Sequence, residues 1–407
     1  MIKVGVIFGG ESVEHEVSII SAIQAMNHLN KEKYQAIPIY IAKDREMYTG
    51  AFLNDVEIYT DMDNLKRYAK NIVLYVKDNR IVLQNKKGFK GIVEEIDIVL
   101  PVVHGTNVED GTLQGYLDLL GIPYVGSNVY SAAVGQDKVF MKQIFESEGM
   151  NVPKYTWFFE SEYKNNSEKI IEDIEKLKYP VIIKPARLGS SIGISKAHNR
   201  EELTSGIEDA INYDTKILVE EVIPNLTEVN ASVLGDYTYY QVSELEEVMG
   251  NDEFLSYNDK YIGSSSSKGK LKGGVKSASH NVGSKGMVST NRIIPANIDK
   301  KLKEEIINMT KQAARVLNTS GVARIDYLID KKKKKAYINE INTIPGSLSF
   351  YLWEPTGKKY SELLDDIITL AIKNYKKRSK MTFSFDSNIL QNYNGSKGAK
   401  GMKGKLR

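Results

Sequence analysis

Short apolar runs alternate with amphipathic stretches in the first third of the chain. Residues 1–8 form a buried-strand pattern that ends at a pair of glycines, a helical pattern follows, and residues 96–103 repeat the apolar run. A second helical pattern covers residues 113–120. Such alternation is typical of an α/β fold with a doubly wound parallel sheet, whose ligands bind beyond the carboxyl ends of the strands. The loops after Phe8 and Val103 are therefore candidate binding sites.

The hydrophobic pattern changes twice further along the chain. Residues 153–159 and 179–185 read as strands that flank a helix at 168–178, which predicts a small α+β module. A later amphipathic helix at 299–317 has its apolar residues on one face. The interval 47–91 is more polar and lacks a clear period, so we interpret it only as an elaboration of the first domain.

Two strands near the end of this pattern have polar residues at alternate positions. Arg324 and Asp326 lie in R-I-D-Y-L-I-D, and Glu340 and Asn342 lie in A-Y-I-N-E-I-N, with five lysines between the two strings. Residues i and i+2 of a strand share a face, so these four side chains are predicted to converge on one surface of a hairpin.

Carboxylate and amide oxygens are the ligands that Mg²⁺ prefers, and Mg²⁺ also leaves room for water and for substrate phosphates. The face formed by Asp326, Glu340 and Asn342 therefore suits a metal that carries a nucleoside triphosphate. Solvated surface ion pairs are the alternative interpretation of the same pattern, because alternating charge on a hairpin is common.

A second candidate site is the string K-P-A-R-L-G-S-S-I-G at residues 184–193. Glycines and paired serines after a strand present N–H groups and hydroxyls to phosphate oxygens, and Lys184 adds a point charge. A plain hairpin turn is the alternative. Lys138 begins a helix and could supply a second cation, although exposed helix lysines are common. Residues 217–223 form a strand whose main chain could pair with an adenine edge, and Glu228 could then accept from ribose hydroxyls.

Composition restricts the possible functions. The 407 residues are 42% hydrophobic and 26% charged, as in soluble proteins of two or three domains, and contain no cysteine. Disulfides, thiolate zinc sites and cysteine nucleophiles are thereby excluded, and a cytoplasmic location is expected. The apolar run at residues 1–8 is too short for a signal sequence or a membrane span, so no membrane partner is expected.

Basic residues concentrate in two segments. Residues 395–407 hold five basic residues and no acidic one, so the rest of the chain is close to neutral and no nucleic-acid partner is expected. This glycine-rich tail is predicted to be disordered. Residues 263–292, with six basic residues and no acid, are predicted to form a long loop or lid.

Several strings occur in the order found in one enzyme family. They are G-G-E-S-V-E-H-E-V-S at residues 9–18, H-G-T-N-V-E-D-G-T-L-Q-G at 104–115, the loop at 184–193, D-K-Y at 259–261, and R-I-D with N-E-I-N-T-I-P-G between 324 and 346. Over about residues 1–375 the chain resembles the D-alanine:D-alanine ligase family of ATP-grasp enzymes.

The resemblance implies an N-terminal Rossmann-like domain, a two-part ATP-grasp fold and a tail. The expected boundaries are residues 1–136, 137–221, 222–377 with the basic loop 263–292, and 378–407. ATP would lie between the two ATP-grasp parts. Two D-alanines would be joined through an acyl phosphate as a peptidoglycan precursor, with two Mg²⁺ ions, or Mn²⁺ in their place. The family habit is a homodimer.

The resemblance also implies roles for individual residues. ATP phosphates would be held by Lys138, Lys184, Ser190 and Ser191, and the adenine by Glu220, Glu221, Val222 and Ile223. Glu228 would hold the ribose, and Asp326, Glu340 and Asn342 the metal ions. Glu14, with Ser190 and Tyr261, would orient the first amino acid. Arg324 and the N–H of Gly346 would form the oxyanion hole. Lys260 would lie near ATP and the second carboxylate, while His15 and His104 would support the site.

The family pattern is broken after Pro345-Gly346. The family has a serine there for the carboxylate of the acceptor, whereas this chain has Tyr351. Ser347, Ser349 or Tyr351 could replace that serine, so the sequence leaves D-serine, D-lactate or another amino acid open as the acceptor. A nucleotide-binding protein without catalysis is a third hypothesis, disfavoured by the complete set of charged site residues.

Overall fold

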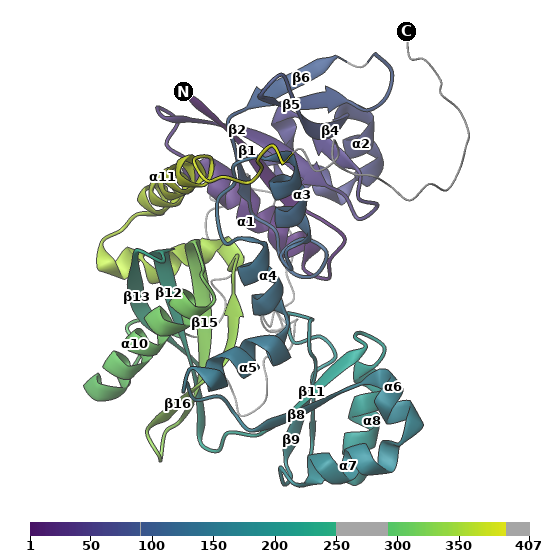
Figure 1. Ribbon diagram of the computed structural model, residues 1–407, viewed down its shortest axis with the longest axis vertical. Coiled ribbons are helices and arrows are strands. Elements are labelled where there is room, and N and C mark those ends of the chain that lie inside the picture. Colours follow the sequence, from purple (N-terminus) through teal and green to yellow (C-terminus); the bar gives the residue numbers. More distant parts are fainter. Residues whose placement is uncertain (90, 250–291, 388–407) are drawn as a thin grey trace, which may run out of the picture.

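The computed structural model describes residues 1–89, 91–249 and 292–387, and its elements form three sheets arranged along the long axis of the molecule (Figure 1). The N-terminal sheet lies at one end, a five-stranded sheet in the middle, and a four-stranded sheet at the other end. Within the part of the chain described, no helix combines the length and apolar content that crossing a membrane requires.

The N-terminal sheet has the strand order β6-β5-β4-β3-β2-β1-β7. Its parallel part is β2-β1-β7, as the alternation of strands and helices predicted. The interval 47–91 adds β3, β4 and β5, which pair antiparallel and were not predicted. The strands are β1 (Ile2–Gly9), β2 (Tyr34–Ile41), β3 (Met47–Thr49), β4 (Lys70–Lys77), β5 (Arg80–Asn85), β6 (Ile92–Ile96) and β7 (Ile98–Pro101).

Helices connect these strands and lead out of the first sheet. They are α1 (His15–His28), α2 (Met62–Tyr68), α3 (Thr112–Leu120) and α4 (Val129–Gln136), with short 3-10 turns at Ala51–Asn54 and Val56–Thr60. Gly9 ends β1 with a φ of 89°, and a Cβ there would lie 2.2 Å from the carbonyl oxygen of Ile41. The chain can therefore turn from β1 toward α1 at this point only with glycine.

The four-stranded sheet has the order β10-β9-β11-β8 and carries a separate apolar core that it shares with its helices. Its strands are β8 (Tyr155–Phe159), β9 (Val181–Pro185), β10 (Ser195–Ala197) and β11 (Lys216–Glu221). Its helices are α6 (Glu160–Asn165), α7 (Ser167–Glu175) and α8 (Arg200–Ala210). The predicted α+β module is confirmed.

The five-stranded sheet has the order β14-β13-β12-β15-β16 and is antiparallel throughout. Its strands are β12 (Leu226–Asp236), β13 (Tyr239–Val248), β14 (Arg292–Ile293), β15 (Gly321–Asp330) and β16 (Lys335–Asn342). The predicted amphipathic helix is α10 (Lys300–Val316), and it packs on this sheet together with α5 (Lys138–Ser147). The basic loop predicted at 263–292 lies outside the described residues except for Arg292, which belongs to β14.

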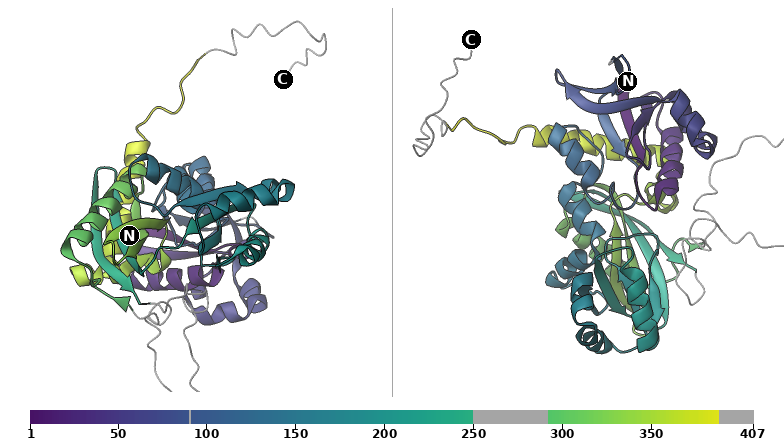
Figure 2. Two further views of the ribbon diagram at one scale, coloured as in Figure 1. Left: turned by 90° about the horizontal axis from the view of Figure 1, so that it is seen from below. Right: turned by 90° about the vertical axis from the view of Figure 1, so that its right-hand side faces the viewer.

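One large core joins the two ends of the sequence. Apolar side chains of the N-terminal sheet pack with those of residues 344–371, and α11 (Tyr360–Arg378) lies beside α1 and this sheet in both Figure 1 and the right-hand view of Figure 2. Two 3-10 turns, η3 (Gly346–Leu352) and η4 (Glu354–Thr356), connect β16 to α11. The predicted tail beyond residue 387 lies outside the described residues.

Asp137 fixes the start of α5 and with it the position of Lys138. Its Oδ1 accepts from the backbone N–H groups of Val139 and Phe140 at 3.0 and 3.1 Å. The same carboxylate accepts from Lys216 Nζ at 3.0 and 2.9 Å, and both side chains of this ion pair are buried. A helix cap and a buried charge pair therefore depend on one residue.

Asp137→Ala is expected to lower the free energy of unfolding by about 3–5 kcal/mol, because it leaves the Lys216 ammonium buried without its partner. Urea denaturation measures this change. Asn128 caps α4 through one bond to Ser131 N at 3.0 Å, so Asn128→Ala is the matched control and should cost about 1 kcal/mol. Equal losses in the two variants would contradict the role given to the buried ion pair.

Candidate active site

The predicted polar face of β15 and β16 is present in the structure. Arg324 pairs across the strands with Asn342, and Asp326 pairs with Glu340. Arg324 donates from Nε and Nη2 to the two carboxylate oxygens of Asp326 at 2.6 and 2.7 Å, and Asn342 Nδ2 donates to Asp326 at 3.2 Å. Burial lowers the pKa of Arg324, but the charge of Asp326 outweighs burial and raises that pKa well above its usual range.

A β-bulge changes the register just beyond this face. Asp326 pairs with Glu340, whereas Tyr327 pairs with Ile338, so Asn339 has no partner across the strands. Bulges often redirect a side chain beside a functional site. Here the amide oxygen of Asn339 accepts from Lys184 Nζ at 3.1 Å, and Asn339 faces the same pocket as Asp326. Sequence reasoning missed Asn339, because strict alternation places it on the opposite face from Glu340.

Asp326, Glu340 and Asn342 fit a magnesium site. They offer two carboxylates and an amide on neighbouring strands, and their present partners are cations or donors that a metal ion would replace. Among the residues described, no group of three or more histidine and acidic side chains could hold a metal by itself. Mg²⁺ needs few protein ligands when phosphates and water complete its octahedron, so this small donor set is compatible with Mg²⁺.

Two predicted phosphate lysines flank this face. Lys138 Nζ donates to the carbonyl oxygen of Leu188 at 2.8 Å and lies 3.5 Å from Glu340 Oε2. Lys184, at the end of β9, lies 2.5 Å from Glu220 Oε2. Burial would raise the pKa of Glu220, but nearby lysine charges outweigh burial and lower it to about 2. The carboxylate of Glu220 is therefore ionised.

The glycine-serine loop comes close to Glu14. Ser190 and Ser191 have left-handed backbones with φ of 54° and 59°. A Cβ on Gly189 would lie 2.7 Å from Glu14 Oε2, so the absence of a side chain lets the loop approach this carboxylate closely without displacing it. Ser190 Oγ donates to Glu14 Oε1. The structure thus brings together two of the three residues predicted to orient the first amino acid, and the third, Tyr261, lies outside the described residues.

Two histidines of the recognised strings are held by hydrogen bonds rather than directed at a ligand. His15 bonds to the carbonyl oxygen of Gly10 at 2.6 Å and to Tyr40 Oη at 3.0 Å. His104 bonds to the carbonyl oxygen of Ile344 at 2.8 Å, and burial lowers its pKa to about 4, so it is neutral near pH 7. His104 nevertheless lines the pocket described below.

Glu109 is a buried carboxylate that sequence reasoning missed, although it lies within the string at residues 104–115. It accepts from Gly105 N at 3.0 Å and from Ile344 N at 2.9 Å, and so joins the loop after β7 to the segment after β16. Burial, followed by the charge of Glu14, raises the pKa of Glu109 to about 8. The only sign of this role in the sequence was that an acidic residue stands between two glycine-containing turns.

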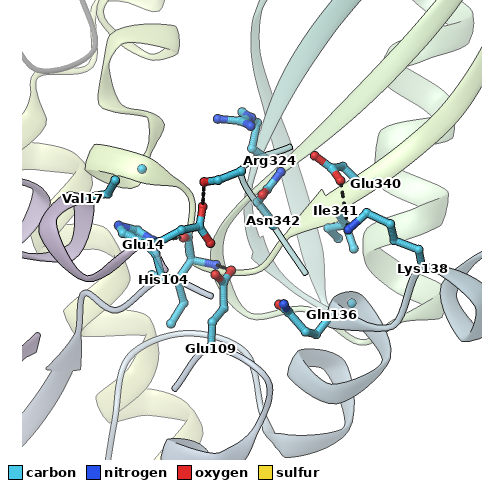
Figure 3. Close-up of a pocket in the computed structure, with 15 residues that line it drawn as sticks. Glu14, Val17, His104, Glu109, Gln136, Lys138, Arg324, Glu340, Ile341 and Asn342 are labelled. Carbon is cyan, nitrogen blue, oxygen red and sulfur yellow. Dashed lines mark hydrogen bonds and ion pairs between the residues drawn. The ribbon is translucent and has the colours of Figure 1, made fainter. Parts of the chain in front are cut away.

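These side chains line two adjoining pockets, and Figure 3 shows the first. The Glu14 pocket is lined by Glu14, Val17, His104, Glu109, Gly135, Gln136, Lys138, Gly189, Ser190, Arg324, Glu340, Ile341, Asn342, Ile344 and Gly346. The Lys184 pocket is lined by Lys138, Lys184, Leu188, Gly189, Ser190, Ser191, Ile194, Glu228, Asn230, Asp326, Tyr327, Leu328, Asn339 and Glu340. Lys138, Gly189, Ser190 and Glu340 face both.

Other predicted site residues lie outside these two pockets. In the strand predicted to contact adenine, Glu220 is buried against lysines, and Glu221 accepts from Lys154 N at 3.0 Å. Val222 and Ile223 follow directly after this strand, β11. Lys260 lies outside the described residues.

The segment after Gly346 has an unusual backbone. Ser347, Leu348 and Ser349 are consecutive left-handed residues with φ of 50°, 52° and 51°. Left-handed backbone costs free energy in residues other than glycine, so the surrounding contacts must hold it. The backbone N–H of Ser347 donates to Ser21 Oγ at 3.0 Å. Ser349 is fully buried, and its hydroxyl has no hydrogen-bond partner among the described residues.

Tyr351, which the sequence resemblance predicts at the position of a family serine, joins a charged network. Its hydroxyl donates to Glu246 Oε2 at 3.3 Å, and Asn230 donates to the same oxygen at 3.2 Å. Arg292 Nε lies 3.1 Å from the other oxygen of Glu246, and its guanidinium lies 4.5 Å from the Tyr351 ring centroid. Burial, followed by the charge of Glu246, raises the pKa of Tyr351 to about 12.

Comparison with known proteins identifies the family. Two family models match, described as D-ala D-ala ligase N-terminus over residues 3–127 and D-ala D-ala ligase C-terminus over residues 144–283 and 279–369. The chain belongs to the D-alanine–D-alanine ligase family. The prediction from the recognised strings is therefore confirmed.

Relatives in this family match the chain over nearly its whole length. A D-alanine–D-alanine ligase of Thermosipho melanesiensis is 40% identical, covering 96% of this chain and 99% of its own. One of Natranaerobius thermophilus is 42% identical, covering 94% and 98%.

Solved structures of ligases have the same fold. The D-alanine–D-alanine ligase of Coxiella burnetii superposes with a TM-score of 0.75 at 26% identity, covering 93% of this chain and 96% of its own. The VanG D-Ala:D-Ser ligase of Enterococcus faecalis gives 0.73 at 31% identity, covering 91% and 99%.

Glu109 makes stability depend on pH. Its pKa is about 8 in the folded protein and about 4.5 as a free side chain, so folding binds a proton more tightly at this site. The stability that Glu109 contributes is fully present below about pH 4.5 and is lost as the pH rises toward 8. Relative to Glu109→Gln, the wild type should therefore lose unfolding free energy between pH 5 and about 8, as urea titrations would show. Parallel pH curves for the two proteins would contradict this assignment.

Proposed function

We propose that this ligase joins two D-alanines into D-alanyl-D-alanine at the expense of ATP. The observation that carries the proposal is that the Glu14 pocket and the Lys184 pocket share Lys138, Ser190 and Glu340. A phosphate chain held by lysines in one pocket can thus reach a carboxylate held in the other. The curated relatives named D-alanine–D-alanine ligase support the choice of substrate.

The first step transfers the γ-phosphoryl group of ATP to the carboxylate of the first D-alanine. One carboxylate oxygen forms the new bond to phosphorus, the bond to the β-phosphate oxygen breaks, and ADP leaves. This chemistry depends on positioning and charge neutralisation. Lys138 and Lys184 would neutralise the phosphates, and Glu14 with Ser190 would hold the ammonium of the amino acid.

Asp326, Glu340 and Asn342 would hold Mg²⁺ ions, which neutralise phosphate charge when bound. The fit of these residues to Mg²⁺ supports the proposal, and two ions are the number that the family resemblance implies. Lys138 and Lys184 would bind phosphate oxygens and would not coordinate the metal.

The second step forms the peptide bond. The amine of the second D-alanine attacks the carbonyl carbon of the acyl phosphate, phosphate leaves, and the amine loses a proton. Arg324 and the N–H of Gly346, which both line the Glu14 pocket, would stabilise the oxyanion of the tetrahedral intermediate. The bond from Ile344 N to Glu109 restrains the segment that carries this N–H group.

Glu340→Gln tests the metal assignment. Replacing one carboxylate should lower kcat by at least about 100-fold while the protein remains folded, because the phosphoryl transfer loses charge neutralisation. Coupled ADP release and circular dichroism provide the two measurements. Glu244, a carboxylate of β13 paired with Lys303 at 2.7 Å and outside both pockets, gives the matched control Glu244→Gln, which should retain activity. Near-normal turnover of Glu340→Gln would show that Glu340 is no metal ligand.

A second candidate function is ligation of D-alanine to D-serine. Tyr351 in place of the family serine and the likeness to the D-Ala:D-Ser ligase of Enterococcus faecalis both favour it. The Tyr351 hydroxyl donates to Glu246, so the position predicted to bind the acceptor carboxylate has a phenol and an acidic neighbour instead of a serine hydroxyl.

Product analysis with D-alanine alone, and then with D-serine or D-lactate added, separates the candidates. D-alanyl-D-alanine as the main product at equal acceptor concentrations is the expected result. Tyr351→Phe should raise the KM of the acceptor amino acid and leave the KM of ATP unchanged if the hydroxyl faces the acceptor. No turnover with D-alanine alone would reject the first proposal while leaving the second.

The oligomeric state and the cellular location of this ligase are two further predictions. The family resemblance implies a homodimer, which light scattering after gel filtration would test. A cytoplasmic location is in keeping with a chain that contains no cysteine.

A further inference from the structure

A lysine that no comparison assigns lies directly behind the phosphate lysines. Lys142 is one turn beyond Lys138 on α5, and its side chain is 0% exposed. Its Nζ lies 2.6 Å from Glu220 Oε1. Lysine is almost never fully buried without a partner, because removing an ammonium from water is costly. This position therefore needs an explanation.

Glu220 is shared between two ammonium groups. Oε1 faces Lys142 at 2.6 Å, and Oε2 faces Lys184 at 2.5 Å. The lysine charges outweigh burial and keep the pKa of Glu220 near 2, so the carboxylate is ionised. Burial lowers the pKa of Lys142 below its usual range, although the charge of Glu220 opposes this effect. Contact with an ionised carboxylate at this distance favours the ammonium form.

The three groups form a line of charges that ends at the ATP site. Lys184 lines the Lys184 pocket, whereas Lys142 and Glu220 do not. With Lys142 present the cluster carries one net positive charge, and without it Glu220 would neutralise Lys184. In a buried setting such a difference acts strongly on a phosphate, since Coulomb interactions are weakly screened there.

We infer that Lys142 is a positioning residue for ATP, one that occupies Glu220 so that Lys184 keeps its charge for the phosphates. The inference rests on the proposed role of Lys184 as a phosphate ligand. Lys142 itself touches no substrate. A buried ion pair that serves stability alone is the competing account, and it predicts that ATP binding is insensitive to the charge of Glu220.

Lys142→Met tests the inference, because methionine has a similar shape and no charge. The KM for ATP should rise on the order of tenfold, while kcat and the KM for D-alanine change little. Phe145→Leu is the matched control, since Phe145 is an uncharged core residue of the same helix and is no member of the Lys142–Glu220–Lys184 cluster. That variant should lose stability without changing the KM for ATP.

The double variant Lys142→Met/Glu220→Gln gives the decisive comparison. The part predicted for residue 220 in adenine binding belongs to its main chain, which Glu220→Gln keeps, and its carboxylate lines neither pocket. Removing the carboxylate as well leaves Lys184 with its whole charge, so the KM for ATP should return to within about threefold of the wild type. A double variant with a KM raised as far as that of Lys142→Met would overturn the inference.

Lys142→Met leaves Glu220 paired with Lys184 and so buries no unpaired charge, whereas the double variant leaves Lys184 with its hydrogen bond to Asn339 Oδ1 at 3.1 Å. Circular dichroism and urea denaturation of both variants establish that each KM is measured on folded protein.

Lys184→Met separates this inference from the proposed function. If Lys184→Met leaves the KM for ATP unchanged, the phosphate role of Lys184 is wrong. If Lys184→Met raises that KM and Lys142→Met does not, only the positioning role of Lys142 is wrong.

Discussion

A single apolar core connects the N-terminal sheet to the chain that follows β16. Side chains of β1, β2 and β7 pack with residues of η3 and α11, more than 200 positions away in the sequence. This packing determines where Glu14 lies relative to Arg324, because one is carried by the N-terminal unit and the other by β15. The hydrogen bonds of Glu109 and His104 to Ile344 then adjust the same junction locally. Catalysis at this site depends first on burial of apolar surface far from any reacting atom.

Buried charges are the second determinant. Asp137 with Lys216, Glu220 with two lysines, and Arg324 with Asp326 all place ions where few water molecules can solvate them. Such pairs contribute little net stability, since desolvation offsets their attraction. Their role here is to orient side chains: Glu220 and Asp326 each hold a cation of the candidate active site in place, and Asp137 fixes the start of the helix that carries Lys138.

The sequence was most informative where the chemistry is local. Alternation alone placed Asp326 and Glu340 on one face, and the start of a helix placed Lys138, since both follow from backbone geometry. Partners remote in sequence could not be predicted in the same way. Glu109 meets Ile344 across 235 residues, and the bulge that turns Asn339 toward Lys184 breaks the period on which the prediction relied.

The fold was predictable to a similar degree. The parallel strands β1 and β7 were evident from continuous apolar runs, whereas β4 and β5 were not, because their side chains are only partly buried and alternate weakly. Strand β3 has only three residues, too few to show a period. The position of Tyr351 was flagged as a departure from its family, yet its partner Glu246 lies 105 residues away on another strand and no local signal points to it.

The hairpin of β15 and β16 turns through a run of five identical residues, Lys331–335. Identical residues carry little information on which of them lies at the tip, and the turn is fixed locally at its start, where Asp330 Oδ1 accepts from the N–H groups of Lys332 and Lys333 at 3.0 and 3.1 Å. Beyond the turn, the bulge at Asn339 and the buried faces that alternate on either side of it align the two strands. Gain or loss of one lysine would lengthen or shorten an exposed tip and leave Asp326 opposite Glu340. The pairing that places these two carboxylates side by side is in that sense insulated from changes in the length of the turn.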